Sequence, residues 1–274
     1  MRVTIVGCSG SMARPGSPAS SYLVQADDAD GRTWNLVLDL GNGAFGALQS
    51  VIDPTYVDGV AITHLHPDHY ADLCSLYVYL RYHPERGEIA TGACAPVPVR
   101  GPQGTGPRVA TAFGLAEGEE LCCFDVETWQ EVWSAEGPTP PRLWHLGPLT
   151  VEAVPVEHPV PAYSLRVTGP SDVHDGEATF VYSGDTDVCD GILEAARDAD
   201  LLLVEAAFQE GRDLTRGIHL TGRRAGEVAT LAGASRAVLT HLQPWTDPEV
   251  ILAEATAAFS GPVDLAAPGA VYRV

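Results

Sequence analysis

Short apolar runs along the chain predict the strands of an α/β protein. Runs of about four to eight residues that are rich in valine, leucine and isoleucine, and bounded by glycine, proline, serine or aspartate, are typical of strands buried in a sheet. Such runs occur at residues 2–6, 22–26, 34–38, 57–62, 95–100, 149–156, 163–167, 178–182, 200–204 and 237–240.

Longer segments between these runs have the pattern of helices packed on a sheet. They occur at residues 44–51, 72–81, 221–232 and 248–259. The alternation of strands with helices, with consecutive strands early in the chain, favours two stacked sheets with helices outside. The chain has 274 residues, of which 45% are apolar. It can therefore bury a large core, and we predict a single domain over residues 1–274.

Residues that can bind a metal stand where several of the predicted strands end. Asp39, His64, His158, Asp185 and His241 each follow such a run directly or closely. Open α/β sheets carry their chemistry at the carboxyl ends of their strands. The sequence therefore places a candidate site at this edge of the fold.

The densest group of such residues is the segment from Thr63 to His69. His64 and His66 lie two apart on extended backbone, so their imidazoles point the same way and can hold one ion. Asp68 and His69 follow a proline in the first turn of a helix and can point at a second ion. The alternative is a histidine-rich surface turn that binds nothing, but such a cluster has little physical reason to follow a buried strand.

The segment His-Leu-His-Pro-Asp-His at residues 64–69 resembles the HxHxDH signature of the metallo-β-lactamase superfamily. Later segments resemble its ribonuclease Z-like phosphodiesterase branch. The stretches 1–11 and 17–22 resemble an actinobacterial group of cyclic-nucleotide phosphodiesterases, and the resemblance covers residues 1 to about 272. It implies an αββα four-layer sandwich and a homodimer.

The resemblance also implies a dinuclear metal site. His158 in Glu-His-Pro-Val, Asp185 in Ser-Gly-Asp-Thr and His241 in Leu-Thr-His-Leu match the later metal motifs of the family. One ion would then be held by His64, His66 and His158, the other by Asp68, His69 and His241, with Asp185 between them. Mixed nitrogen and oxygen ligands favour two zinc ions, with manganese and iron(II) as the alternatives.

Two further residues are candidates for supporting roles. Asp39 could accept a hydrogen bond from a metal-bound histidine and fix its tautomer, or it could simply form the turn in Asp-Leu-Gly-Asn-Gly. His219 in His-Leu-Thr matches the HxT motif of the family and is the candidate general acid. The alternative for His219 is a surface histidine that caps the next helix. Glu205 ends a buried strand, and its role is left open.

The expected chemistry is attack on phosphorus by a metal-bound hydroxide. Two divalent ions roughly 3.5 to 4 Å apart can share a hydroxide, lower its pKa and hold the non-bridging oxygens of a phosphodiester. Asp68 could orient the hydroxide and take its proton, while His219 protonates the leaving alkoxide. The remaining histidines, His83, His145 and His174, match no motif and are expected to be structural or at the surface.

The charge of the chain limits its substrates. It has sixteen arginines, no lysine and 36 acidic residues, which gives a net charge of −20. Affinity for extended nucleic acid comes largely from neutralising phosphates, so such a partner is not expected. A small anionic nucleotide is acceptable, because two divalent ions supply local positive charge.

The cysteines and the apolar runs indicate a cytoplasmic protein. No apolar run is long enough to span a membrane, and no signal peptide is recognisable at the start of the sequence. The six cysteines show no CxxC spacing, so reduced thiols are predicted. The adjacent Cys122 and Cys123 are expected to be two packed thiols.

These observations predict an enzyme that hydrolyses 3′,5′-cyclic nucleotides, cyclic AMP above all, to 5′-monophosphates. Three features favour it over a ribonuclease Z-type tRNA 3′-end endonuclease: the negative charge, the lack of a long basic arm, and the segment 158–163, which resembles the cyclic-nucleotide group. Besides that endonuclease, a non-catalytic nucleotide-binding member of the family remains as an alternative. A lactonase or β-lactamase is disfavoured by the HxT context of His219.

Overall fold

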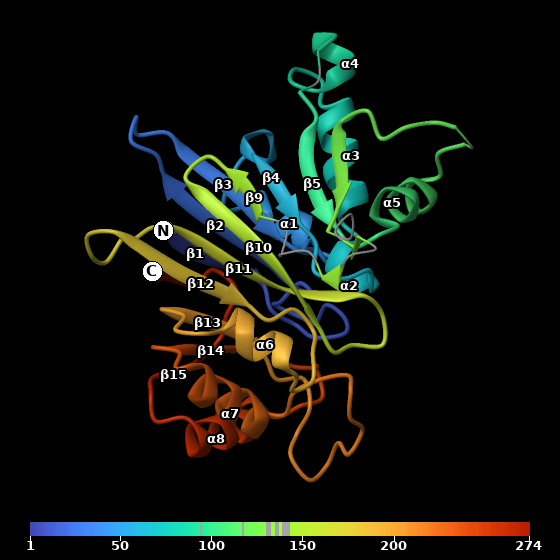
Figure 1. Cartoon of the computed structure of the whole chain (residues 1–274). Coiled ribbons are helices and arrows are strands. Elements are labelled where there is room, and N and C mark those ends of the chain that lie inside the picture. The colour runs from blue at the N-terminus through green and yellow to red at the C-terminus, as the bar shows by residue number, and fades with distance from the viewer. Residues whose placement is uncertain (94, 117, 130–132, 135–136, 139–142) are drawn as a thin grey trace.

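The computed structural model describes residues 1–93, 95–116, 118–129, 133–134, 137–138 and 143–274. Two seven-stranded sheets form its centre (Figure 1): the first is built from the N-terminal half of the chain together with the C-terminal strand β16, and the second from the rest of the C-terminal half. The first sheet has the order β16-β1-β2-β3-β4-β5-β6, and the second β15-β14-β13-β12-β11-β10-β9.

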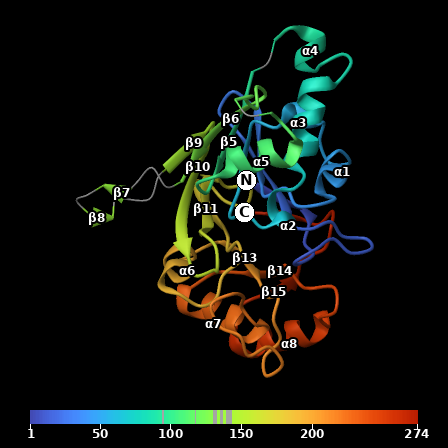
Figure 2. The same ribbon diagram turned by 90° about the vertical axis from the view of Figure 1, so that its right-hand side faces the viewer.

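The strands of the first sheet are β1 (Arg2–Gly7), β2 (Ser21–Asp27), β3 (Thr33–Leu38), β4 (Gly59–Ala61), β5 (Val97–Gly101), β6 (Phe124–Thr128) and β16 (Val271–Arg273). Those of the second are β9 (Leu143–Leu146), β10 (Leu149–Val156), β11 (Ala162–Pro170), β12 (Glu177–Tyr182), β13 (Leu201–Glu205), β14 (Ala237–Thr240) and β15 (Val263–Leu265). A separate pair, β7 (Trp133–Ser134) and β8 (Gly137–Pro138), projects from the body of the molecule (Figure 2).

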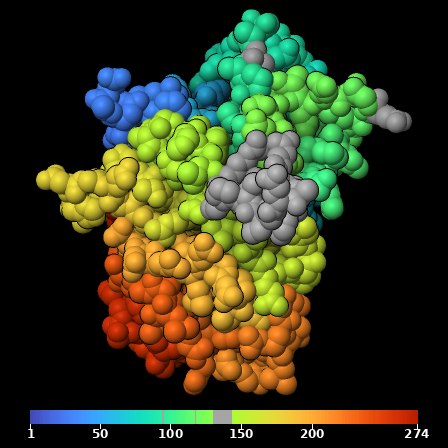
Figure 3. Space-filling view, viewed as in Figure 1, coloured from blue at the N-terminus to red at the C-terminus, as the bar shows by residue number. Residues whose placement is uncertain are grey.

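Helices cover the outer face of each sheet. On the first sheet these are α1 (Ala44–Leu48), α2 (Pro67–Tyr70), α3 (Leu73–Tyr82) and α5 (Thr105–Phe113), with the 3-10 turn η1 (Pro54–Tyr56), while α4 (Glu88–Thr91), which has no buried residue, packs against α3. On the second they are α6 (Asp190–Ala195), α7 (Gly222–Ala232) and α8 (Pro248–Ala258). Seen from outside, the segment that carries α6, α7 and α8 forms the lower part of the molecule (Figure 3).

Alternation along the strands creates the layers. In β3, Leu36 and Leu38 pack into the core between the sheets, while Val37 points to the helices outside. In β13, Leu203 faces the same central core and Leu202 packs under the helices of the second half. Because successive side chains of a strand point to opposite faces, each sheet is apolar on both sides and needs a cover on both. The result is an αββα four-layer sandwich, which confirms the fold predicted from the sequence.

Parallel strands bring the predicted metal residues to one edge. In the first sheet β3 and β4 run parallel, and in the second β12, β13 and β14 do. The loops that follow four of these strands, together with the loop after β10, carry the candidate site. The loop after β3 packs closely against the backbone of α2. A Cβ at Gly41 would lie 1.9 Å from the carbonyl oxygen of Asp68. Only glycine allows this approach.

The structure differs from the sequence prediction mainly at short elements. The run 57–62 forms a strand only at Gly59–Ala61, and the helix predicted from residue 72 is preceded by the single turn α2. Several elements at the sheet edges were not predicted at all, namely β6, β9, β15 and β16. They are short, and their apolar pattern is too brief to identify them.

Cys8, Cys74, Cys122 and Cys189 are free thiols, and Sγ of Cys122 lies 3.9 Å from Sγ of Cys123. Cys94, the sixth, lies outside the described residues, as do parts of the acidic segment 117–141. Among the described residues, no helix is both long and apolar enough to cross a membrane.

Candidate metal centre

The structure brings together all of the residues predicted to hold metal. They lie in the loops after β4, β10, β12 and β14 and in the helical turn α2, and they form two groups of four that share one aspartate. The residues are His64, His66, Asp68, His69, His158, Asp185 and His241. Within each group the possible ligand atoms all lie within 4.8 Å of one another.

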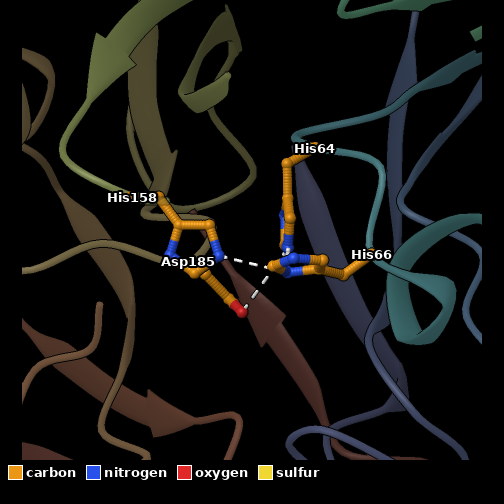
Figure 4. Close-up of side chains that lie close together, drawn as sticks. All are labelled: His64, His66, His158 and Asp185. Atoms are coloured by element: carbon orange, nitrogen blue, oxygen red, sulfur yellow. Dashed lines mark hydrogen bonds and ion pairs between the residues drawn. The ribbon is translucent and has the colours of Figure 1, made fainter. Parts of the chain in front are cut away.

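The first group consists of three histidines and Asp185 (Figure 4). The Nδ1 atom of His66 lies 3.0 Å from Nε2 of His64 and 3.2 Å from Nε2 of His158. One carboxylate oxygen of Asp185, Oδ2, lies 3.7 Å from Nε2 of His64. The three ring nitrogens therefore converge on one point beside that carboxylate.

The second group surrounds the other side of Asp185. Nε2 of His69 lies 3.3 Å from Oδ1 of Asp185 and 3.4 Å from Oδ2 of Asp68. Nε2 of His241 lies 3.2 Å from Oδ2 of Asp185 and 3.7 Å from Oδ2 of Asp68. Asp185 thus offers oxygen atoms to both groups, which is the arrangement a bridging carboxylate needs.

These donors fit a pair of divalent cations. Ligands about 2.0–2.1 Å from a tetrahedral zinc lie roughly 3.3 Å from one another, and the spacings above centre on that value. Three buried atoms of the cluster, Oδ2 of Asp68, Nε2 of His69 and Oδ1 of Asp185, have no hydrogen-bond partner among the described residues. Buried polar atoms are normally paired, and a cation between these three would satisfy them all.

The electrostatics also suit cations. Burial, and after it the neighbouring histidines, lower the pKa of His64 well below its usual value. Burial likewise lowers the pKa of His66, His158 and His241, so these rings are neutral near pH 7 with a lone pair to donate.

His69 behaves differently. Burial alone would lower its pKa, but Asp185, Asp39 and Asp68 raise it well above the usual value. The surrounding carboxylates therefore favour the protonated, positively charged ring of His69 in the place that a metal cation would take. Metal ligation requires the neutral ring, so an ion bound here would displace that proton.

Asp39 fixes the orientation of His69. Its Oδ2 accepts hydrogen bonds from Nδ1 of His69 at 2.7 Å, from the hydroxyl of Thr63 at 2.8 Å and from the hydroxyl of Tyr182 at 3.0 Å. Its Oδ1 accepts from the backbone N–H of Thr63 at 2.8 Å. Because Nδ1 of His69 is hydrogen-bonded to Asp39, Nε2 of His69 faces the cluster.

Other imidazoles are oriented by partners that the sequence did not reveal. Nδ1 of His158 donates to the carbonyl oxygen of Ile218 at 2.9 Å, and Nδ1 of His241 lies 2.9 Å from the hydroxyl oxygen of Ser20. Nε2 of His241 also accepts a long hydrogen bond, 3.3 Å, from the backbone N–H of Ser11, which ligation would replace. These contacts join residues more than fifty positions apart, so no local pattern indicates them.

Backbone strain accompanies the site. Asp39 and His241, which directly follow β3 and β14, have positive φ angles of 53° and 58°. Left-handed backbone is uncommon for residues other than glycine and gathers at functional positions. Each strand thus turns sharply at the residue that serves the cluster.

His219 stands beside the cluster on the loop before α7. Its Nδ1 lies 2.8 Å from Oε1 of Glu205, and its ring is 5.6 Å from that of His158 and 5.5 Å from that of His241, centroid to centroid. Burial would lower the pKa of His219, but the charge and hydrogen bond of Glu205, helped by Asp185, raise it to about 9. The ring is therefore a cation near pH 7. Asp185, Glu205 and His219 form a third group of possible ligands.

Glu205, whose role the sequence left open, is the fully buried partner of His219. Its carboxylate also accepts from the backbone N–H groups of Thr186 at 3.1 Å and Ala207 at 2.9 Å. The one signal in the sequence was an acidic residue at the end of a buried strand. His83, His145 and His174 lie outside all three groups, as expected.

Comparison with known proteins places this geometry in a family. The model of the β-lactamase superfamily domain matches residues 35–242, about three quarters of the chain. The chain belongs to the metallo-β-lactamase superfamily. It is a metallo-hydrolase of this superfamily with residues that could bind metal.

Two similar proteins span nearly the whole length of the chain, and a third spans somewhat more than half of it. Protein Rv1339 of Mycobacterium tuberculosis is 41% identical over 266 residues, which cover 96% of this chain and 88% of that protein. The crystal structure of the metallo-β-lactamase fold protein YhfI from Bacillus subtilis superposes with a TM-score of 0.81 at 26% identity, covering 100% of this chain and 99% of YhfI. A ribonuclease Z from Myxococcus xanthus is 35% identical over 169 residues, 58% of this chain and 51% of that enzyme.

Proposed function

We propose that this metallo-hydrolase is a phosphodiesterase that converts 3′,5′-cyclic nucleotides, cyclic AMP above all, to 5′-monophosphates. The observation that carries the proposal is the pair of Glu205 and His219 at the side of a cluster suited to two cations. A phosphodiester gives an alkoxide leaving group, which is expelled far more easily when it is protonated. A β-lactam or lactone hydrolase is disfavoured because His219 stands in an HxT context that resembles the phosphodiesterase branch of the family.

The roles of the residues follow from their positions. The seven donors would hold two divalent ions, zinc first, which would activate water for attack on phosphorus and offset charge on the phosphate oxygens. His219, with Nδ1 held by Glu205, would donate a proton from Nε2 to the leaving oxygen. Asp68, whose Oδ2 has no other hydrogen-bond partner among the described residues, would accept a hydrogen bond from the attacking water and direct it.

Asp68 is better suited to orienting the water than to storing its proton. Burial would raise the pKa of Asp68, but His69 and His241 lower it well below its usual value. A carboxylate with such a low pKa is a weak base. We therefore assign the orienting role to Asp68 and the acid role to His219.

The charge of the chain supports a small substrate. A net charge of −20 repels a polynucleotide, while a small anion needs only the local field of the two ions. The projecting hairpin of β7 and β8 lies within the segment 117–141, which has no arginine or lysine. An arm that grips RNA would need basic residues there.

The second candidate function is tRNA 3′-end cleavage, which the similarity to a ribonuclease Z over 58% of the chain favours. Both reactions use the same chemistry on phosphorus, so the site alone does not separate them. They differ in the surface that the substrate requires. Polynucleotide binding depends steeply on salt, whereas turnover of a cyclic nucleotide does not.

Product analysis tests the proposal. The protein loaded with zinc or manganese is incubated with 3′,5′-cyclic AMP and, separately, with a precursor tRNA, each at low and high salt. We expect 5′-AMP from the first, intact tRNA in the second, and only a modest effect of salt. Cleaved tRNA with untouched cyclic AMP would refute the cyclic-nucleotide assignment in favour of the nuclease.

A further inference from the structure

Asp187, two residues beyond Asp185, is a buried carboxylate that joins three loops of the site. Its side chain is 1% exposed. Oδ2 accepts from Nε of Arg216 at 2.6 Å and from the backbone N–H of Gly217 at 2.8 Å, and Oδ1 accepts from Nη1 of Arg224. Its own backbone N–H donates to the carbonyl of Glu157 at 3.0 Å.

These contacts reach the segment that carries the candidate acid. Gly217, Ile218 and His219 are consecutive, and each is held by a different partner: Gly217 by Asp187, Ile218 by the ring of His158, and His219 by Glu205. Gly217 has a φ of 75°, a left-handed conformation that turns the chain there. Three successive residues are thus each held by a hydrogen bond to a residue of the site or next to it.

The backbone contact of Asp187 with Glu157 extends the link to the metal cluster, because Glu157 directly precedes His158. The ring of His158 is oriented by the carbonyl of Ile218, next to Gly217. A shift of Gly217 would therefore move the carbonyl oxygen of Ile218, which accepts from His158, and also the backbone of His219. Displacements well below 1 Å are enough to slow a reaction that depends on positioning.

We propose that Asp187 is a positioning residue, which holds the loop from residue 206 to residue 219 so that His219 and His158 keep their places. Arg216 completes this arrangement from the solvent side, because its side chain is 64% exposed while it donates to Asp187. Arg224, 8% exposed, neutralises the carboxylate from within. The catalytic part of this inference rests on the proposed phosphodiesterase function.

Arg216→Ala tests the proposal without leaving a buried charge unpaired, because Arg224 still neutralises Asp187. The matched control is Arg212→Ala, which removes another arginine of the same loop, 35% exposed and paired with Asp213 instead. Both variants are measured for metal content, for hydrogen exchange of peptides covering 206–221, and for turnover of two phosphodiesters. One substrate has an alkoxide leaving group and the other p-nitrophenolate, which leaves without a proton.

In Arg216→Ala we expect exchange at 206–221 to be about fivefold or more faster than in the wild type and in Arg212→Ala, with full metal content. Turnover should fall about tenfold for the alkoxide substrate and less than about twofold for p-nitrophenolate. Unchanged exchange, or equal losses on both substrates, would overturn the positioning role. If the wild type cleaves no phosphodiester, the proposed function fails, and the exchange comparison still decides whether Asp187 and Arg216 hold this loop.

Discussion

Oε1 of Glu205 accepts a hydrogen bond from Nδ1 of His219 at 2.8 Å, and both side chains are shielded from solvent. The pair combines residues from the end of β13 and from the loop before α7. A buried carboxylate in direct contact favours the protonated imidazole, and the pKa of His219 is raised to about 9. An acid that stays protonated at neutral pH is what protonation of a leaving alkoxide requires.

The substitution Glu205→Gln should move the alkaline limb of the pH profile. In the wild type the imidazolium is present below its pKa of about 9 and is lost as the pH rises through it. Without the carboxylate, burial dominates and lowers the pKa of His219, so activity on an alkoxide substrate should decline at lower pH. The logarithm of kcat/KM against pH gives the position of the limb.

Glu210→Gln is the control for that experiment. Glu210 is a carboxylate of the same loop that accepts from the hydroxyl of Thr221 at 2.7 Å and has no contact with His219. Its substitution should leave the alkaline limb in place. A limb that moves equally in both variants, or in neither, would contradict the assignment of Glu205 as the group that keeps His219 protonated.

The substitution His219→Ala should slow turnover of an alkoxide substrate much more than that of a p-nitrophenolate substrate, with the metal content unchanged. We expect turnover of the alkoxide substrate to fall by about a hundredfold or more, as is typical when a general acid is removed. The p-nitrophenolate substrate should lose far less, because its leaving group is stable without a proton. Steady-state kinetics with both substrates, with metal content measured alongside, check this. His145→Ala, at an exposed histidine outside the cluster, should change neither rate.

Local sequence patterns placed candidate donors at strand ends, and the resemblance to the metallo-β-lactamase superfamily supplied their assignment to two ions. One short segment after the apolar run 57–62 contains His64, His66, Asp68 and His69. Asp185 and His241 follow the clear apolar runs 178–182 and 237–240. Because parallel strands end at a common edge, the residues after β4, β12 and β14 are expected to lie close together, whereas His158 after the antiparallel β10 was assigned from the family motif. The layers follow in the same way from the alternation of residues such as Leu36, Val37 and Leu38.

The partners that orient these donors could not be predicted. Ser20 meets His241 across 221 positions, and Ile218 meets His158 across 60. Such contacts depend on how the two sheets pack, and a serine hydroxyl or a backbone carbonyl has no sequence signature of its own. The role of Asp187 could not be predicted either. From the sequence, an aspartate after Ser-Gly-Asp-Thr is expected to be a turn residue, and only the structure shows its contacts with Arg216 and Arg224.

The substitution Asp39→Asn should weaken metal binding without unfolding the protein. Asparagine tolerates the positive φ of 53° at this position, but it has no charge and only one acceptor oxygen for four donors. His69 would then be a poorer and less well oriented ligand, and we expect the affinity for zinc to fall about 10- to 100-fold. Competition with a chelator measures this affinity. Asp53→Asn, at the half-buried N-cap of η1, should bind zinc as the wild type does.

The substitution Asp185→Asn should remove both ions together. Asp185 is the residue that the two groups of four donors share, and its two oxygens approach His69, His241 and His64. An amide in its place offers one neutral oxygen and directs N–H groups at a cation, so neither group keeps its charge balance.

Metal content and thermal unfolding check this prediction about Asp185. A ligand that binds only the folded state stabilises it by about 2.7 kcal/mol at a hundred times its Kd, so zinc should raise the Tm of the wild type. In Asp185→Asn that rise should disappear along with the activity. Asp190→Asn, at the exposed first turn of α6, should retain both. An Asp185→Asn protein that carried two ions and remained active would show that the groups bind their ions independently and that Asp185 does not bridge them.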